Sequence, residues 1–112
     1  PEDTGVRVDR GVLLRERGEA REAMRDFKRA LEDDPRCVRA LIERAVLHRE
    51  LGDLAPALVD LSAALRHAPG HPRAQLERGG VLGEQGDLTG ALADLDQVVV
   101  ATPGDAGALG VR

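Results

Sequence analysis

Apolar residues recur along this chain at the spacing of helices rather than strands. In residues 39–51 they form one helical face that includes Leu41 and Ala45, and a second face that holds Ile42 and Val46. A helix that is apolar on more than one side needs neighbours on more than one side. The pattern therefore predicts short helices that pack in layers, each touching several others.

Helix breakers divide the chain at regular intervals. After residues 39–51, Gly52 suits a left-handed C-cap, Asp53 an N-cap and Pro56 the first turn of the next helix, which a Pro-Gly pair then ends. The predicted helices span residues 3–17, 21–33, 36–51, 55–67, 71–85 and 89–101, with a seventh beginning near Asp105. The sequence thus predicts an all-α fold.

The same residue types return every 34 residues. Four in-phase columns hold glycine, alanine, aspartate and proline: Gly18, Gly52 and Gly86; Ala23, Ala57 and Ala91; Asp26, Asp60 and Asp94; Pro35, Pro69 and Pro103. A fixed period of about 20 to 50 residues is the mark of a solenoid, in which each unit buries its apolar face against its neighbours. A further column of small residues falls where two helices would have to approach closely: Gly11, Ala45 and Gly79.

The period also predicts how the chain is organised. We expect a single array over residues 1–112, with repeats at about 1–34, 35–68 and 69–102 and a partial helix over 103–112. Pro1 is in phase with Pro35, and Arg112 is in phase with earlier arginines. We therefore expect the chain to be a piece of a longer protein.

In the middle copy, the order of small residue, glycine, alanine, large apolar residue, alanine and proline is filled by Ala45, Gly52, Ala57, Leu61, Ala64 and Pro69. Over the whole chain this pattern resembles the tetratricopeptide repeat family. The resemblance implies a right-handed α-solenoid of antiparallel helix pairs, here three repeats and a truncated fourth. It also implies a non-catalytic protein–protein interaction scaffold with a concave groove for a peptide or helical segment of a partner.

By this resemblance, the groove is lined by the first helix of each pair. Its apolar columns are Val8, Ile42 and Leu76, beside Val12, Val46 and Gly80. Its basic edges are Arg39 and Arg73 on one side and Arg15 and Arg49 on the other, and its acidic column is Glu16, Glu50 and Glu84. A ligand with apolar side chains and some acidic groups would suit such a lining. The open alternative is that the aliphatic residues only shield the groove and no peptide binds.

Relatives that clamp the C-terminal carboxylates of chaperones place Lys, Asn and Arg in those apolar columns. This chain has none of them there. The chaperone clamp is therefore not expected.

A column of arginines departs from the family pattern and comes with matched aspartates. Around the glycine turn, Arg44 would face Asp60, and the other copies would pair Arg10 with Asp26 and Arg78 with Asp94. A bidentate Arg–carboxylate contact suits such a semi-buried site and satisfies the charge. We therefore interpret these residues as structural ion pairs, with a ladder of arginines that grips an acidic ligand as the alternative.

Composition and charge argue against some classes of binding partner. The net charge of −4 and the pI near 5.3 disfavour nucleic acid and anionic membranes. Aromatic residues make up 1% of the chain, which argues against a stacking platform for bases. A single cysteine, Cys37, favours a reducing compartment, so we expect a cytoplasmic protein.

No catalytic or metal-binding constellation is found. His67 and His71 are four residues apart, but a Pro-Gly pair breaks the helix between them. His48 occupies a packing column, and Cys37 is interpreted as an inert surface thiol. We expect no enzyme activity, no cofactor and no metal. The alternative function is a self-associating or regulatory arm of a larger, possibly enzymatic, protein.

Overall fold

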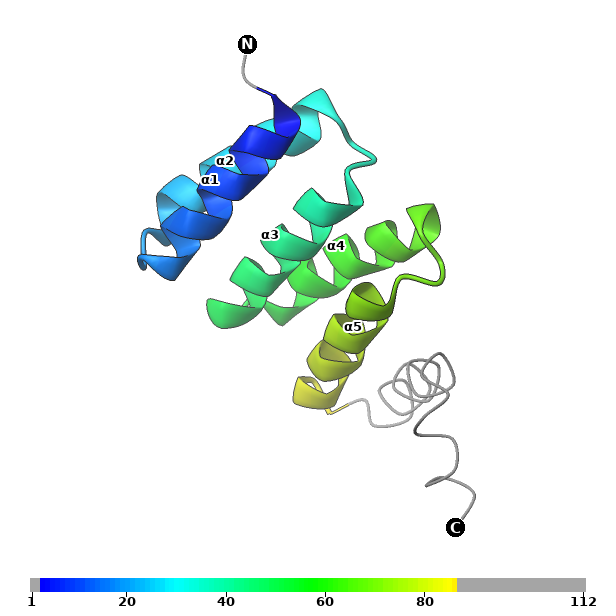
Figure 1. Ribbon diagram of the computed structural model, residues 1–112. Coiled ribbons are helices and arrows are strands. Elements are labelled where there is room, and N and C mark those ends of the chain that lie inside the picture. Colours follow the sequence, from blue (N-terminus) through cyan, green and yellow to red (C-terminus); the bar gives the residue numbers. More distant parts are fainter. Residues whose placement is uncertain (1–2, 87–112) are drawn as a thin grey trace, which may run out of the picture.

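The computed structural model describes residues 3–86, which form five α-helices and no strand (Figure 1). The helices are α1 (Thr4–Glu16), α2 (Ala20–Asp33), α3 (Val38–Glu50), α4 (Leu54–His67) and α5 (Pro72–Glu84). The expected all-α fold is confirmed, and the five helix boundaries differ from those expected by a few residues at most. The helix expected at 89–101 and the partial helix at 103–112 lie outside the described residues.

Glycine turns join the two helices of each pair. Gly18 and Gly52 both have a φ of +83°, in the left-handed region that glycine enters without a steric penalty. Each closes the end of its helix with hydrogen bonds, such as the one from the Gly52 N–H to the Arg49 carbonyl at 3.0 Å. The conformation that the period predicts at these positions is therefore the one the chain adopts.

The expected cap at Asp53 is only partly formed. Asp53 stands at the N-cap position of α4, but its side chain makes no capping hydrogen bond. Pro56 occupies the third position of the helix, and proline has no N–H to donate there. One of the backbone N–H groups from which an N-cap carboxylate usually accepts a hydrogen bond is therefore missing at the start of α4.

Helix α3 lies at the centre of the described part and packs against all four other helices. Figure 1 shows α1, α3 and α5 in one layer, with α2 and α4 behind them. Leu41, Ile42, Ala45 and Leu47 of α3 are all buried, although they point to different sides of the helix. The prediction that the first helix of a pair needs neighbours on several sides is confirmed.

Small residues allow the two helices of a pair to approach closely. A Cβ atom at Gly11 would lie 2.5 Å from Cε1 of Phe27, well inside van der Waals contact. The Phe27 ring is fully buried and occupies the space that a side chain at residue 11 would need. Ala45 and Ala57, in the corresponding small-residue columns of the second pair, are also buried.

One face of α1 is exposed where the equivalent faces of later helices are covered. Val6 and Leu13 are 53% and 61% exposed, whereas Leu47 and Val81, in the same column as Leu13, are buried. Helices α2 and α4 pack against α3 and α5, respectively. Within the described residues no helix covers α1 in the same way.

Candidate functional site: the face of the first helices

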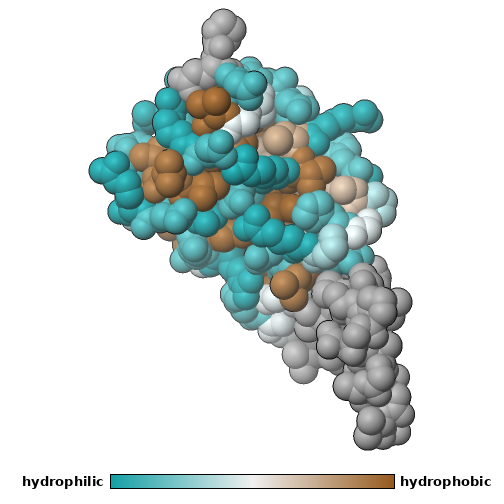
Figure 2. Space-filling view, in the orientation of Figure 1, coloured by the Kyte–Doolittle hydropathy of each residue, from teal (hydrophilic) through white to brown (hydrophobic). Residues whose placement is uncertain are grey.

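The surface formed by α1, α3 and α5 is the candidate site, and we call it the first-helix face. Consecutive first helices contact one another, so their outward side chains form a continuous surface. Figure 2, viewed from the side on which these helices lie in front, shows apolar patches interrupted by polar side chains.

The apolar lining of this face is smaller than the sequence predicts. Val8 and Ile42 belong to the hydrophobic core and are essentially inaccessible, so they cannot line an open groove. Val12 and Val46 are partly buried against that core, and Leu76 is about half exposed. In this column, Val8 of α1 and Ile42 of α3 are each followed by another first helix of the stack. In the described part no further first helix follows α5, and Leu76 stays about half exposed.

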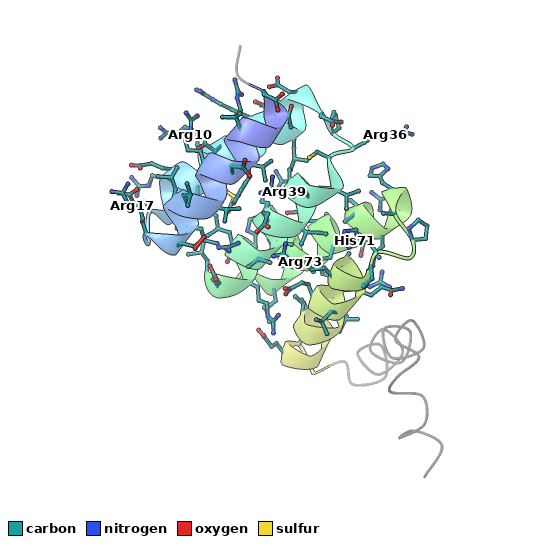
Figure 3. The ribbon with its side chains drawn as sticks, in the orientation of Figure 1. Arg10, Arg17, Arg36, Arg39, His71 and Arg73 are labelled. Carbon is teal, nitrogen blue, oxygen red and sulfur yellow. The ribbon has the colours of Figure 1, made fainter. Side chains whose placement is uncertain are left out.

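A buried carboxylate links three repeats beneath this face. Glu43 of α3 accepts a hydrogen bond of 2.8 Å from Arg15 of α1 and another of 2.8 Å from Arg73 of α5. Figure 3 shows Arg73 on α5, on the side of the molecule where α3 and α5 lie in front. Burial raises the pKa of Glu43, but the hydrogen bonds and charges of Arg73 and Arg15 outweigh it and hold that pKa below its usual value.

The Glu43 junction is part of a repeated pattern that sequence reasoning missed. Asp9, Glu43 and Glu77 are spaced by the 34-residue period, which was a signal available in the sequence. Asp9 accepts a hydrogen bond from Arg39, and Glu77 accepts one of 3.0 Å from Arg49. Each acidic residue therefore binds an arginine of an adjacent repeat, and only Glu43 binds one from both sides in the described part.

Arg49 is held from two directions. Its guanidinium group donates to Glu77 and to Glu84, and it lies over Gly80, where a Cβ atom would be 2.9 Å from its terminal nitrogens. Burial lowers the pKa of Arg49, but the bonds and charges of Glu84 and Glu77 outweigh it and raise that pKa. The absence of a side chain at Gly80 thus makes room for the arginine.

The basic edges take part in ion pairs between repeats. Arg15, Arg39, Arg49 and Arg73, which the sequence assigns to acidic groups of a ligand, each lie against a carboxylate of a neighbouring repeat. The acidic column also forms an ion pair between repeats, because Oε1 of Glu50 lies 3.7 Å from Nε of Arg15. Together with the buried or partly exposed Asp9, Glu43 and Glu77 column, the charged columns of the first helices carry six carboxylates and four guanidinium groups: Asp9, Glu16, Glu43, Glu50, Glu77 and Glu84 against Arg15, Arg39, Arg49 and Arg73.

A hollow opens on this face between α3 and α5. Its volume is about 410 Å³, and it is lined by Val46, Arg49, Glu50, Glu77 and Glu84. The lining holds three carboxylates and one guanidinium group, and that guanidinium group, of Arg49, is already paired to Glu77 and Glu84. The net charge of the lining is therefore negative. A basic or neutral group fits it better than an acidic one.

The Arg–Asp pairs lie inside the helix pairs. Arg10 donates from Nε and Nη2 to the two carboxylate oxygens of Asp26, at 2.8 and 2.9 Å, and Arg44 donates likewise to Asp60 at 2.9 and 2.8 Å. Both aspartates are buried. The hydrogen bond from Arg44 to Asp60 raises the pKa of Arg44. Arg78 has an interaction, but its expected partner, Asp94, lies outside the described residues.

The remaining candidate residues have ordinary surroundings. Cys37 is a half-buried free thiol at the N-cap position of α3. His71 caps α5, where its Nδ1 accepts a hydrogen bond of 3.3 Å from the Ala74 N–H. His48 is mostly buried, and its Nε2 lies 3.9 Å from Asp60. Within residues 3–86 no three His, Cys, Asp or Glu side chains are grouped to bind a metal, and no helix is apolar and long enough to cross a bilayer.

Comparison with protein families agrees with this geometry. A family model described as tetratricopeptide repeat matches residues 8–62 and 57–106. The chain belongs to the tetratricopeptide repeat family. No curated protein matches the chain.

Solved structures of tetratricopeptide regions, and of one further protein, share the fold. The second such region of Spaghetti (RPAP3), bound to the HSP90 peptide SRMEEVD, superimposes with a TM-score of 0.84 at 20% identity, over 88% of this chain and 92% of that one. A tetratricopeptide repeat protein from Parabacteroides merdae gives a TM-score of 0.85 at 26% identity, over 92% of this chain and 40% of that one. The MamA protein gives 0.82 at 15% identity, over 94% of this chain and 57% of that one.

One of these findings is at odds with an expectation from the sequence. The chaperone clamp was not expected, yet the first and second tetratricopeptide regions of RPAP3 are both similar in fold and both bind the HSP90 peptide. Their identities of 20% and 22% carry the fold and not the binding residues.

Proposed function

We propose that this tetratricopeptide chain is a non-catalytic protein–protein interaction scaffold, and that its first-helix face is a concave groove for an extended or helical segment of a partner. The observation that carries the proposal is the network around Glu43, Arg15 and Arg73, which fixes the side chains of three consecutive first helices. A preorganised surface loses less conformational entropy on binding. A cytoplasmic location, which rests on the single cysteine, is part of the proposal.

The chemistry of the face indicates the kind of segment. Leu76 and the exposed edges of Val12 and Val46 offer apolar contact, next to the negative hollow between α3 and α5. The partner segment should therefore carry apolar side chains together with basic or neutral groups. Structural neighbours that bind a peptide support the general mode of binding.

Peptide selection with a matched pair of variants tests this function. Peptides selected from a random library on the wild-type chain should bind in fluorescence anisotropy, and Val46→Arg should weaken them by about tenfold or more because a charge fills the hollow. Val59→Arg is the control, since Val59 is exposed on α4. Equal binding by both variants, or no selected peptide, would contradict the proposal. Labelled SRMEEVD peptide, assayed alongside, tests directly whether this chain shares the ligand of its neighbours.

A second candidate is a self-associating or regulatory arm of a larger protein. The exposed side chains of Val6 and Leu13 on α1 favour it, because Leu47 and Val81, the positions equivalent to Leu13, are buried by helix packing. Sedimentation velocity distinguishes the two functions. Self-association that Leu13→Glu abolishes would support this candidate, and a monomer at all concentrations would contradict self-association.

A further inference from the structure

A second concave site lies at the edge of the molecule where the helix pairs turn. It is a cleft of about 600 Å³ lined by Ala20, Arg21, Met24, Arg25, Lys28 and Leu51. Figure 1 shows the α1–α2 and α3–α4 turns on the same edge, and the cleft is formed by α2 and the residue that follows α3. It shares no lining residue with the hollow on the first-helix face.

The floor of this cleft is apolar and specific to this pair of repeats. Met24 and Ala20 pack against the core from α2, and Leu51 is 52% exposed at the C-cap of α3. Where the middle repeat has Leu51, the first has Arg17 and the third has Gln85. The exposed leucine is therefore not required by the repeat.

The rim of the cleft carries three cations that have no partner within residues 3–86. Arg21, Arg25 and Lys28 make no hydrogen bond or ion pair with any of the residues that the structure describes. They stand at successive turns of α2, and all three side chains are exposed. The packing of α2 therefore does not explain their presence.

The equivalent positions of the next repeat show that the fold does not need these charges. In α4, the residues in phase with Arg21, Arg25 and Lys28 are Ala55, Val59 and Ser62. α4 forms the same kind of helix pair with α3 as α2 forms with α1. In a chain with a net charge of −4, this cationic rim is the exception.

We propose that this cleft, which we call the turn cleft, docks an acidic peptide segment that carries a large apolar side chain. The apolar side chain lies against Met24 and Leu51, and flanking Asp or Glu carboxylates meet Arg21, Arg25 and Lys28. Arginine can take a carboxylate through two hydrogen bonds, so two of the three cations favour carboxylates in fixed orientation. This partner differs in charge from the one proposed for the first-helix face, and the turn cleft does not depend on that proposal.

A peptide array with charge-reversal variants tests the turn cleft. The probes are labelled short peptides that combine one Phe, Leu or Ile with several Asp or Glu residues. Some members should bind the wild-type chain, and the double variant Arg25→Glu with Lys28→Glu should lose about tenfold or more in affinity. Leu51→Asp should also lose binding, because it removes the apolar floor. The matched control is Arg29→Glu, an exposed cation of α2 outside the cleft, which should change affinity by less than about twofold.

Control peptides and a further variant show which ligand chemistry the turn cleft binds. Peptides with Lys in place of Asp and Glu, and peptides with Ala in place of the apolar residue, should not bind. Val46→Arg should leave binding unchanged, which separates this site from the first-helix face. The proposal is overturned if no acidic member binds, if Arg29→Glu weakens binding as much as the double variant, or if only vesicles of phosphatidylserine bind to the cationic rim.

Discussion

Replacing Glu43 by glutamine should destabilise the chain far more than the same kind of change at Asp9. Both residues accept a hydrogen bond from an arginine of another repeat, but Glu43 is buried and accepts two. Glutamine keeps the size of the side chain and removes its charge, so Arg15 and Arg73 lose their buried counter-ion, although the exposed Glu50 stays 3.7 Å from Arg15. Asp9 has a side chain that is 62% exposed.

The magnitude follows from the exposure of the two arginines. A hydrogen bond to a charged group contributes about 1.5–3 kcal/mol where it is shielded from water. The Arg15 side chain is 15% exposed and should lose most of that, whereas the Arg73 side chain is 44% exposed and can turn towards solvent, which limits its loss to about 1 kcal/mol. We therefore expect Glu43→Gln to lower the free energy of unfolding by about 2–4 kcal/mol. Asp9→Asn should lower it by less than about 1 kcal/mol.

The pH dependence of stability gives an independent check. The folded-state pKa of Glu43 is lower than its usual value, so its stabilising contribution is present above the usual glutamate pKa and is lost as the pH falls through the lower, folded pKa. Glutamine does not titrate. The loss of stability on the acid side should therefore be smaller in Glu43→Gln than in the wild type.

Urea denaturation followed by far-ultraviolet circular dichroism measures both effects. The slope of the free energy against denaturant should be similar in the three proteins, so that midpoints can be compared. Glu43 does not have this stabilising role if Glu43→Gln is no less stable than Asp9→Asn, or if its acid-side loss of stability equals that of the wild type.

The remaining predictions concern packing and the ion pairs inside the helix pairs. Asp60→Ala should destabilise the chain by about 3 kcal/mol, the low end for a broken buried pair, because the Arg44 side chain retains some access to water. Denaturant midpoints measure this change, and a loss of peptide binding without a loss of stability would favour a ligand-gripping role instead. Leu47→Ala should cost about 2–5 kcal/mol, as expected for a buried leucine. Leu13→Ala, at the equivalent exposed position, should cost less than about 1 kcal/mol, and equal costs would show that α1 is covered in solution.

The features that the sequence predicts well are those set within one repeat. The turns at Gly18 and Gly52 could be predicted because a helix pair needs a left-handed residue there, and glycine is the residue that enters this region freely. The ion pair between Arg44 and Asp60 could be predicted in the same way, because the two residues lie at similar sequence separations from the turn between their helices. The geometry of a single helix pair is enough to determine such contacts.

The features that the sequence did not reveal depend on how repeats stack. Glu43 meets arginines that are 28 and 30 residues away, at offsets that differ from the 34-residue period. The period shows which residues are equivalent, but the shift between neighbouring helix pairs decides which columns touch. The same shift buries Val8 and Ile42 beneath the next repeat, although their positions in the helix suit an open groove.

A nuclear magnetic resonance titration tests the proposed groove most directly. The chain is labelled with ¹⁵N, a selected peptide that carries apolar and basic side chains is added, and the amide shifts are followed to saturation. The largest shifts are expected on α1, α3 and α5, near Val12, Val46 and Leu76. Shifts confined to α2 and α4, or no shifts at saturating peptide, would contradict the assignment of the first-helix face as the binding surface.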